Sequence, residues 1–207
     1  MSEPDSRLEG SAAVASWGGG VSPFGVSWQK LMMWSFLITD ALLFAGFLTA
    51  YGFARLASPS WPEQSDVFTM GLIGTMTFVL ITSSATMASA VRAAQRQDLR
   101  RAGMFILLTA VGGAVFLGMQ AYEWTGAIHE GARLGSNPWG TRAFAAFFFM
   151  ITGFHGTHVL IGVIVLAIVT FRVRAGRTGS DGVELAGLYW HFVDLVWVFI
   201  FTCFYLI

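Results

Sequence analysis

The stretch MITGFHGTHVLIGVIVLAIV, residues 150–169, decides the fold class of this chain. It contains no Asp, Glu, Lys or Arg over a length close to the ~20 residues that cross a bilayer as an α-helix. Two titratable rings, His155 and His158, stand inside this run three residues apart, so a helix places them on one face. We therefore expect a membrane-spanning helix that carries two imidazoles on one side.

The rest of the chain has the same apolar character. Hydrophobic residues make up 55% of the 207 residues and charged residues only 12%, whereas roughly 25% of a soluble domain is charged. Nineteen Phe and eight Trp are too many for one soluble core of this size. We predict an all-α fold, a polytopic membrane helix bundle with five transmembrane helices at about 28–53, 67–91, 102–125, 143–171 and 184–207.

The segments between these spans carry turn-forming residues. Proline, glycine, serine and asparagine gather in ASPSWPEQSD (57–66), GARLGSNPWG (131–140) and RAGRTGSDG (174–182). Residues 1–27 are polar, rich in Ser, Ala and Gly, and without the apolar core of a signal peptide. We expect a flexible cytoplasmic tail over residues 1–27 and the transmembrane bundle over residues 28–207.

The basic residues predict an orientation in the membrane. With five spans, the N-terminus and the second and fourth loops face one side, and that side collects nine of the twelve cations. The other side has three, namely Arg55, Arg133 and Arg142. Because basic residues favour cytoplasmic loops, we expect the N-terminus in the cytoplasm and Ile207 outside. The net charge of zero gives no reason to expect a nucleic-acid partner.

Away from the cytoplasmic ends of the predicted spans, six acidic or histidine residues lie within them, where insertion scales assign an ionisable residue a cost of roughly 2.5–3.5 kcal/mol. They are Asp40, Glu123, His155, His158, His191 and Asp194. At about 1.5 Å per helical residue, Asp40, His158 and Asp194 fall within roughly 5 Å of one depth. This common depth allows a polar layer in the membrane, and we predict that Asp40 hydrogen-bonds His158.

Two interpretations of these polar groups compete. Two of the spans each carry a pair of polar groups at i and i+3, a spacing that could hold a metal, but the Glu-x-x-His pairs and further carboxylates of a bundle di-metal site are missing. The alternative is that they hydrogen-bond neighbouring helices, as polar side chains commonly do in membrane bundles. Trp190 lies on the same helix face as Asp194, which is typical of a packed seam. We favour packing and expect no metal site in this chain.

Four longer motifs point to a known family. In chain order they are WSFLITDALLFAGFLTAY (34–51), FLGMQAYEW (116–124), ITGFHGTHVLIG (151–162) and YWHFVDLVWVFIF (189–201). The first resembles the helix with an intramembrane acid in subunit III of haem–copper respiratory oxidases. The second resembles the Gln-x-x-Glu segment that follows it, and the last two resemble the final two helices. The resemblance to this cytochrome c oxidase subunit III family, in its short five-helix type, covers residues 28–207.

The resemblance implies an accessory subunit without a redox centre in the bacterial cytoplasmic membrane. Its expected partners are oxidase subunit I and subunit II, which hold the haems and copper, and membrane phospholipids. Its expected roles are to stabilise the catalytic subunit and to support proton uptake while the complex reduces oxygen. Asp40 matches the intramembrane acid and Arg172 a basic position suited to a lipid phosphate, with Arg92 and Arg96 as further head-group candidates. The polar positions of the motifs are matched by Glu123, His155, His158, Trp190, His191 and Asp194.

Two features depart from the longer members of that family. The intramembrane acid is Asp40 where the pattern usually has Glu, and the two helices that precede the first span in longer members are missing. The leading expectation is subunit III of a cytochrome c oxidase, with a quinol oxidase or a nitric oxide reductase complex as alternatives. A small proton-coupled transporter with Asp40 as a relay is the competing class, although such transporters usually show internal repeats and broken helices.

Overall fold

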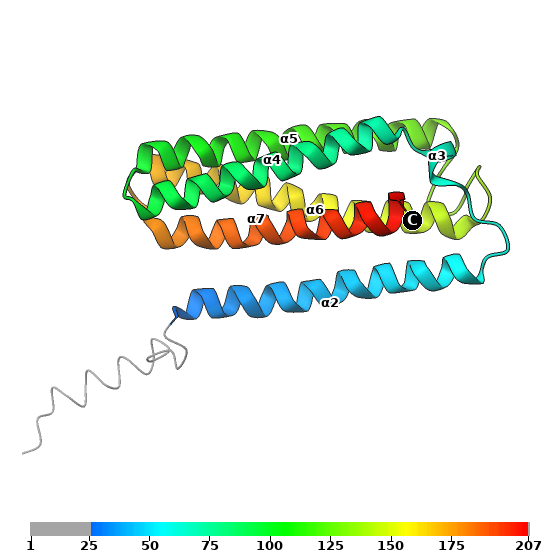
Figure 1. Ribbon diagram of the computed structural model, residues 1–207, viewed down its shortest axis with the longest axis horizontal. Helices are drawn as coiled ribbons and strands as arrows, with labels where there is room; N and C mark the ends of the chain where they lie inside the picture. Colours follow the sequence, from blue (N-terminus) through cyan, green and yellow to red (C-terminus); the bar gives the residue numbers. More distant parts are fainter. Residues whose placement is uncertain (1–25, 207) are drawn as a thin grey trace, which may run out of the picture.

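The computed structural model describes residues 26–206 and consists of long helices that run side by side (Figure 1). The flexible tail expected over residues 1–27 falls outside the described residues except for its last two, and Ile207 also falls outside them. Five helices are long and apolar enough to cross a membrane, which confirms the predicted all-α bundle. The helices, in chain order, are α2 (Trp28–Ala57), α3 (Gln64–Val67), α4 (Met70–Gln95), α5 (Leu99–His129), α6 (Arg142–Arg174) and α7 (Ser180–Ile200). A π-helical segment, η1 (Phe201–Leu206), continues α7.

Most helices extend beyond the predicted spans by several residues. Helix α5 has 31 residues, which at 1.5 Å per residue is about 46 Å and exceeds the ~30 Å hydrocarbon core. Its start is set by Asp98, whose side chain accepts a hydrogen bond from the Arg101 amide at 3.0 Å. Helix α2 ends at Ala57, just before Ser58 and Pro59, where proline disfavours a helical predecessor. Hydropathy located the apolar parts of these helices, whereas capping residues and proline set their ends.

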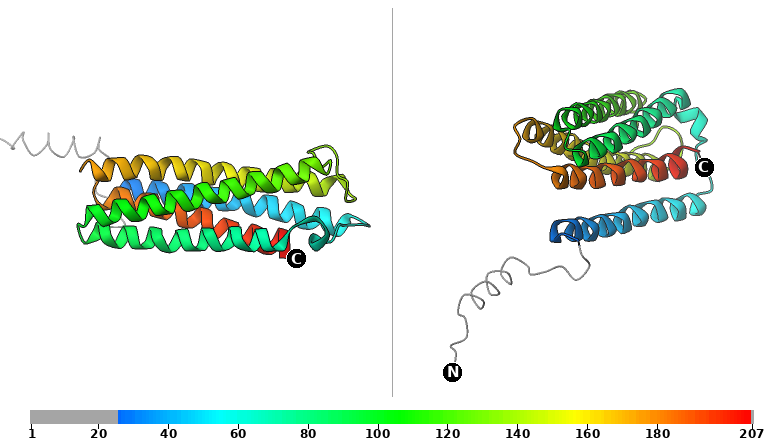
Figure 2. Two further views of the ribbon diagram at one scale, coloured as in Figure 1. Left: turned by 90° about the horizontal axis from the view of Figure 1, so that it is seen from above. Right: turned by 60° about the vertical axis from the view of Figure 1, so that its left-hand side comes forward.

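Helices α4, α5, α6 and α7 form the core of the bundle, and α2 lies on its outside. Helix α4 packs on α5 and α7, and α6 packs on the same two helices. The main contacts of α2 are with α7 and α6, and it is seen set apart from the other four long helices in Figure 1 and in the right-hand view of Figure 2. Few of its side chains are buried, namely Leu37, Asp40, Phe44 and Tyr51. Asp40 is the only acidic residue among these four buried residues.

Trp190 fixes the spacing of three core helices. Its indole is completely buried and lies against two glycines, Gly113 of α5 and Gly162 of α6. A Cβ atom built on Gly162 would lie 2.9 Å from the Trp190 ring, and one on Gly113 would lie closer still. The indole Nε1 donates a hydrogen bond to the Ser83 hydroxyl of α4 at 3.0 Å. Four helices therefore meet around one side chain, and this packing sets the rotation of α7 and the residues on it.

Candidate functional site

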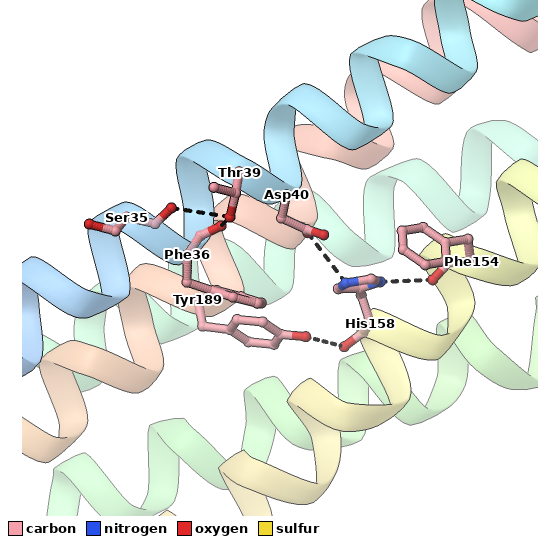
Figure 3. Close-up of polar contacts among 7 residues, drawn as sticks. All are labelled: Ser35, Phe36, Thr39, Asp40, Phe154, His158 and Tyr189. Atoms are coloured by element: carbon pink, nitrogen blue, oxygen red, sulfur yellow. Dashed lines mark hydrogen bonds and ion pairs between the residues drawn. The ribbon is translucent and has the colours of Figure 1, made fainter.

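The polar pair Asp40 and His158 joins the outlying helix α2 to α6. His158 Nε2 lies 3.3 Å from Asp40 Oδ2, an ion-pair distance, and both side chains are nearly buried (Figure 3). Asp40 Oδ2 makes no hydrogen bond that meets angular criteria. The two residues predicted to form a hydrogen bond therefore lie within ion-pair distance of each other, but the hydrogen bond itself is not formed between them. The contact joins one titratable group from each helix at a depth where water is scarce.

The second nitrogen of His158 determines where its proton lies. His158 Nδ1 is 2.9 Å from the carbonyl oxygen of Phe154, and a carbonyl oxygen can only accept, so Nδ1 donates. The other ring nitrogen, Nε2, faces the Asp40 carboxyl. This mutual contact lowers the cost of placing two ionisable groups inside the membrane.

Helix α7 contacts the Asp40–His158 pair through Tyr189. The Tyr189 hydroxyl donates to the backbone oxygen of His158 at 3.1 Å (Figure 3). Its ring stacks on Phe36 of α2, with ring centroids 6.3 Å apart. Phe44 of α2 closes the other side, with its centroid 5.4 Å from the His158 ring. Three helices thus hold His158 in one orientation among aromatic rings.

His155 lies one turn away and has a different environment. The side chain is completely buried, and neither ring nitrogen has a hydrogen-bond partner within residues 26–206. Its ring contacts Phe116 edge-on at a centroid distance of 5.8 Å and lies 5.2 Å from Trp197. Both histidines were expected to form hydrogen bonds between helices. His158 has polar contacts of this kind, whereas for His155 the expected role stays a prediction.

A second polar seam joins α7 to α4. The His191 ring Nδ1 lies 2.7 Å from the Ser84 hydroxyl, one residue from the Trp190–Ser83 bond. Two turns further along α7, Trp197 Nε1 donates to Thr77 at 3.0 Å. Asp194 is buried between His191 and Trp197 along α7, yet neither of its oxygens has a hydrogen-bond partner in the described chain. Serine and threonine hydroxyls of α4 therefore supply the hydrogen-bond partners of Trp190, His191 and Trp197.

Glu123 forms a third polar group at the opposite end of the bundle. Its Oε2 accepts from Gln120 Nε2 at 2.7 Å and from the Tyr205 hydroxyl at 3.2 Å. Tyr205 belongs to η1 and is completely buried beside Phe68 and Phe204. The Gln-x-x-Glu spacing thus brings its two ends together on α5 and holds the C-terminal π-helical turn. The sequence pattern had marked Gln120 and Glu123, but nothing in it indicated Tyr205.

The three predicted head-group arginines do not converge on one place. Arg92 lies in the last turn of α4 and Arg96 directly follows that helix. Arg172 lies in the last turn of α6, and its Nε donates to the Thr178 hydroxyl at 3.1 Å. None of the three is buried, so each stays a candidate by position alone.

One interhelical ion pair was missed by the sequence analysis. Lys30 of α2 bonds Glu184 of α7 at 2.8 Å, with both side chains partly exposed. Both residues lie near helix ends, where hydropathy gives no signal, so only the packing of α2 on α7 shows that they meet. Together with the Asp40–His158 contact, this pair attaches α2 at two heights. Within the described residues, no group of three or more His, Cys, Asp or Glu side chains is arranged to hold a metal ion.

Fold and site together define a class, an integral membrane helix bundle with ionisable groups buried in its spans, one pair of which, Asp40 and His158, meets across helices. The family model described as Cytochrome c oxidase subunit III matches residues 24–207. The chain therefore belongs to the cytochrome c oxidase subunit III family, as the four motifs had indicated.

Several named relatives align with this chain over most of the length of both proteins. Cytochrome c oxidase subunit 3 of Bacillus sp. (strain PS3) is 34% identical over 181 residues, which is 85% of this chain and 84% of the relative. The protein of the same name from Thermostichus vulcanus is 35% identical, over 83% of this chain and 84% of its own. Quinol oxidase subunit 3 of Bacillus subtilis (strain 168) is 34% identical over 85% of both chains.

Proposed function

We propose that this chain is the non-catalytic subunit III of a proton-pumping haem–copper terminal oxidase in aerobic respiration. The observation that carries the proposal is the match of the family model to residues 24–207. Relatives named cytochrome c oxidase subunit 3 also align over most of the bundle. In this proposal oxidase subunits I and II hold the haems and copper, and this chain stabilises subunit I and supports its proton uptake. Cytochrome c is the proposed electron donor of the complex.

A quinol oxidase is the second candidate complex. Relatives named quinol oxidase subunit 3 reach 34–35% identity over 85% of this chain, compared with 34–36% for relatives named cytochrome c oxidase subunit 3. The two complexes differ in the electron donor, so the donor specificity of the purified complex distinguishes them.

The two ion-pair contacts of α2 support a structural role in such a complex. Helix α2 leaves a broad apolar face uncovered, with Met32, Leu42, Phe53 and Leu56 all well exposed. That face can contact lipid or a partner subunit only if α2 keeps its rotation on the bundle. Asp40 and Lys30 each hold α2 to another helix through one contact. We infer that these two contacts present the apolar face of α2 in a constant orientation.

Purification through this chain tests the assignment. A tagged chain, solubilised in mild detergent, should bring with it a larger haem-bearing subunit whose reduced-minus-oxidised spectrum identifies its haems. Oxygen uptake by the same preparation should respond to reduced cytochrome c, and a response to quinol alone would select the second candidate. A chain that purifies alone and moves a solute in liposomes would contradict both and favour a transporter.

The proposed orientation in the bacterial cytoplasmic membrane gives a second prediction. The start of α2, the α4–α5 turn and the α6–α7 turn lie at one end of the bundle (Figure 1). In a Cys203→Ser background, Arg96→Cys and Arg174→Cys should be protected from an impermeant thiol reagent in intact cells, whereas Arg133→Cys should react. The reason is that basic residues gather at the cytoplasmic end. Labelling of Arg96→Cys from outside would reverse the orientation, and permeabilised cells serve as the control.

A further inference from the structure

A surface groove of about 230 Å³ lies between α5 and α6. Both helices are long and apolar enough to cross a membrane, so the groove faces the hydrocarbon and not water. Its lining is mostly small or apolar and includes Gln120, Ala121, Trp124, Gly153, Gly156 and Thr157. In the membrane, this space is filled either by a lipid chain or by a neighbouring helix.

Gly156 leaves an opening in the groove next to Gln120. The Trp124 indole of α5 donates to the Thr152 hydroxyl of α6 at 3.1 Å, so these two residues lie level with each other. Because α5 and α6 run antiparallel, four residues back along α5 and four residues forward along α6 are level again, which pairs Gln120 with Gly156 (Figure 1). A Cβ atom built on Gly156 would meet no atom within 4 Å. A side chain from a neighbouring molecule can therefore enter above Gly156 at the level of Gln120.

Gln120 brings an unpartnered acceptor to this opening. The residue is only 5% exposed, and its Nε2 donates to Glu123 Oε2 at 2.7 Å. The carboxylate takes the amide nitrogen because it accepts hydrogen bonds, so the amide oxygen is the atom left over. Gln120 Oε1 is shielded from solvent and has no hydrogen-bond partner within residues 26–206. A buried acceptor without a donor is costly, and the cost is removed by a donor from outside this chain.

The other polar groups of the groove have already used their protons. The Trp124 indole donates to Thr152, and the hydroxyls of Thr152 and Thr157 each donate to a backbone oxygen one turn earlier on α6. Among the described residues, the groove therefore presents acceptors and no free donor. A lipid acyl chain would fill the space but has no donor for Gln120. A side chain with an N–H group would do both.

We propose that this groove is the docking site for a transmembrane helix of another subunit, which inserts an amide or indole N–H donor above Gly156 and donates it to Gln120 Oε1. The small residues Ala121, Gly153 and Gly156 let the backbone of that helix approach closely, as is common between membrane helices. The inference rests on the proposed function, since an accessory subunit has partner helices. It adds which face of this chain such a helix contacts and which chemical group it brings.

Photocrosslinking in native membranes tests the face. The crosslinking amino acid p-benzoylphenylalanine is placed at Leu160, which lines the groove, or at Val115 of α5, which is equally exposed but does not line it. The Leu160 position should give an adduct with a transmembrane helix that carries Asn, Gln or Trp near the crosslinked residue, and Val115 should give much less. Adducts mainly with lipid, equal adducts at Val115, or a helix without such a donor would overturn the site. A donor-bearing helix from a protein that is not an oxidase subunit would support the site and contradict the proposed function.

Substitutions in the groove test the contact itself. Gly156→Leu fills the opening and leaves the Gln120–Glu123 bond in place, so it should weaken association at least about fivefold, equivalent to about 1 kcal/mol at the low end for overpacking. The matched control Gly118→Leu adds the same side chain at an exposed position of α5 with no atom within 4 Å, and it should associate as the wild type does. Association is measured as the partner subunit retained per tagged chain when the purified complex is diluted in detergent. Unchanged retention in Gly156→Leu, or an equal loss in Gly118→Leu, would overturn the docking site.

Gln120→Met tests the hydrogen bond. It keeps the length of the side chain and removes the acceptor, so association should weaken about threefold, as for an average polar contact between membrane helices. Because both changes act on one contact, the double variant Gln120→Met, Gly156→Leu should lose little more than Gly156→Leu alone. Circular dichroism of each variant checks that the bundle is folded. Losses that multiply in the double variant would show that Gln120 acts elsewhere and would overturn its role as the acceptor.

Discussion

Trp190→Ala should destabilise the bundle by about 3 kcal/mol, at the lower end of the range for a buried Trp in soluble proteins. The lower end applies because lipid is as apolar as the core, so little transfer energy is lost and the cavity dominates. The indole is fully buried against Gly113 and Gly162 and also loses its bond to Ser83. Unfolding by sodium dodecyl sulfate in mixed micelles, followed by far-ultraviolet circular dichroism, measures the difference.

Trp34→Ala is the matched control for this change. Trp34 lies on α2 with 52% of its surface exposed, so its loss leaves no internal cavity and should cost much less. Gly162→Ala approaches the same contact from the other side. Its new Cβ would lie 2.9 Å from the indole, and overpacking of this kind costs typically about 1–3 kcal/mol. Equal destabilisation by Trp190→Ala and Trp34→Ala would show that Trp190 does not set the helix spacing.

Asp40→Ala should cost about 1.7 kcal/mol, near the upper limit measured for polar contacts inside membrane bundles. The upper limit applies because the change leaves His158 Nε2 nearly buried and without its Asp40 partner, and removes one of the ion-pair contacts that join α2 to the bundle. The double variant Asp40→Leu, His158→Leu removes both groups, so it should lose less than either single variant. A double-mutant cycle in the same unfolding assay gives the coupling energy.

The functional consequence of Asp40→Ala separates two roles. If the pair only holds α2, oxygen uptake and proton release should begin near normal and decline sooner over many turnovers as the complex loosens. Immediate loss of proton release at normal oxygen uptake would identify Asp40 as a proton relay. Phe78→Ala, at an exposed residue of α4 outside the apolar face of α2, is the control and should leave both measurements unchanged. No change in stability or activity in Asp40→Ala would make the pair an incidental contact.

The polar layer shows how far sequence patterns reach. Common depth predicted that Asp40 and His158 could meet, because rise per residue is constant in any helix. Depth alone does not give rotation, and rotation left His155 without a hydrogen bond while His158 gained two contacts. The two histidines are three residues apart, less than one helical turn. That rotation is enough to place the His155 ring against Phe116 and Trp197.

The sequence by itself determined the class, the number of spans and the family of this protein. These follow from local properties, since hydropathy and the cost of a buried ionisable group depend on each residue and its near neighbours. Hydropathy placed the start of the third span at about residue 102, whereas α5 begins at Leu99 after its capping residue Asp98.

Only the tertiary structure decided which polar groups meet. Glu123 and Tyr205 come from different helices, and so do Lys30 and Glu184. Their meeting depends on how far each helix is rotated and shifted against the next, and that is set by close packing of shapes such as Trp190 on Gly162. Such complementarity belongs to pairs of distant residues, so no pattern along a single chain contains it.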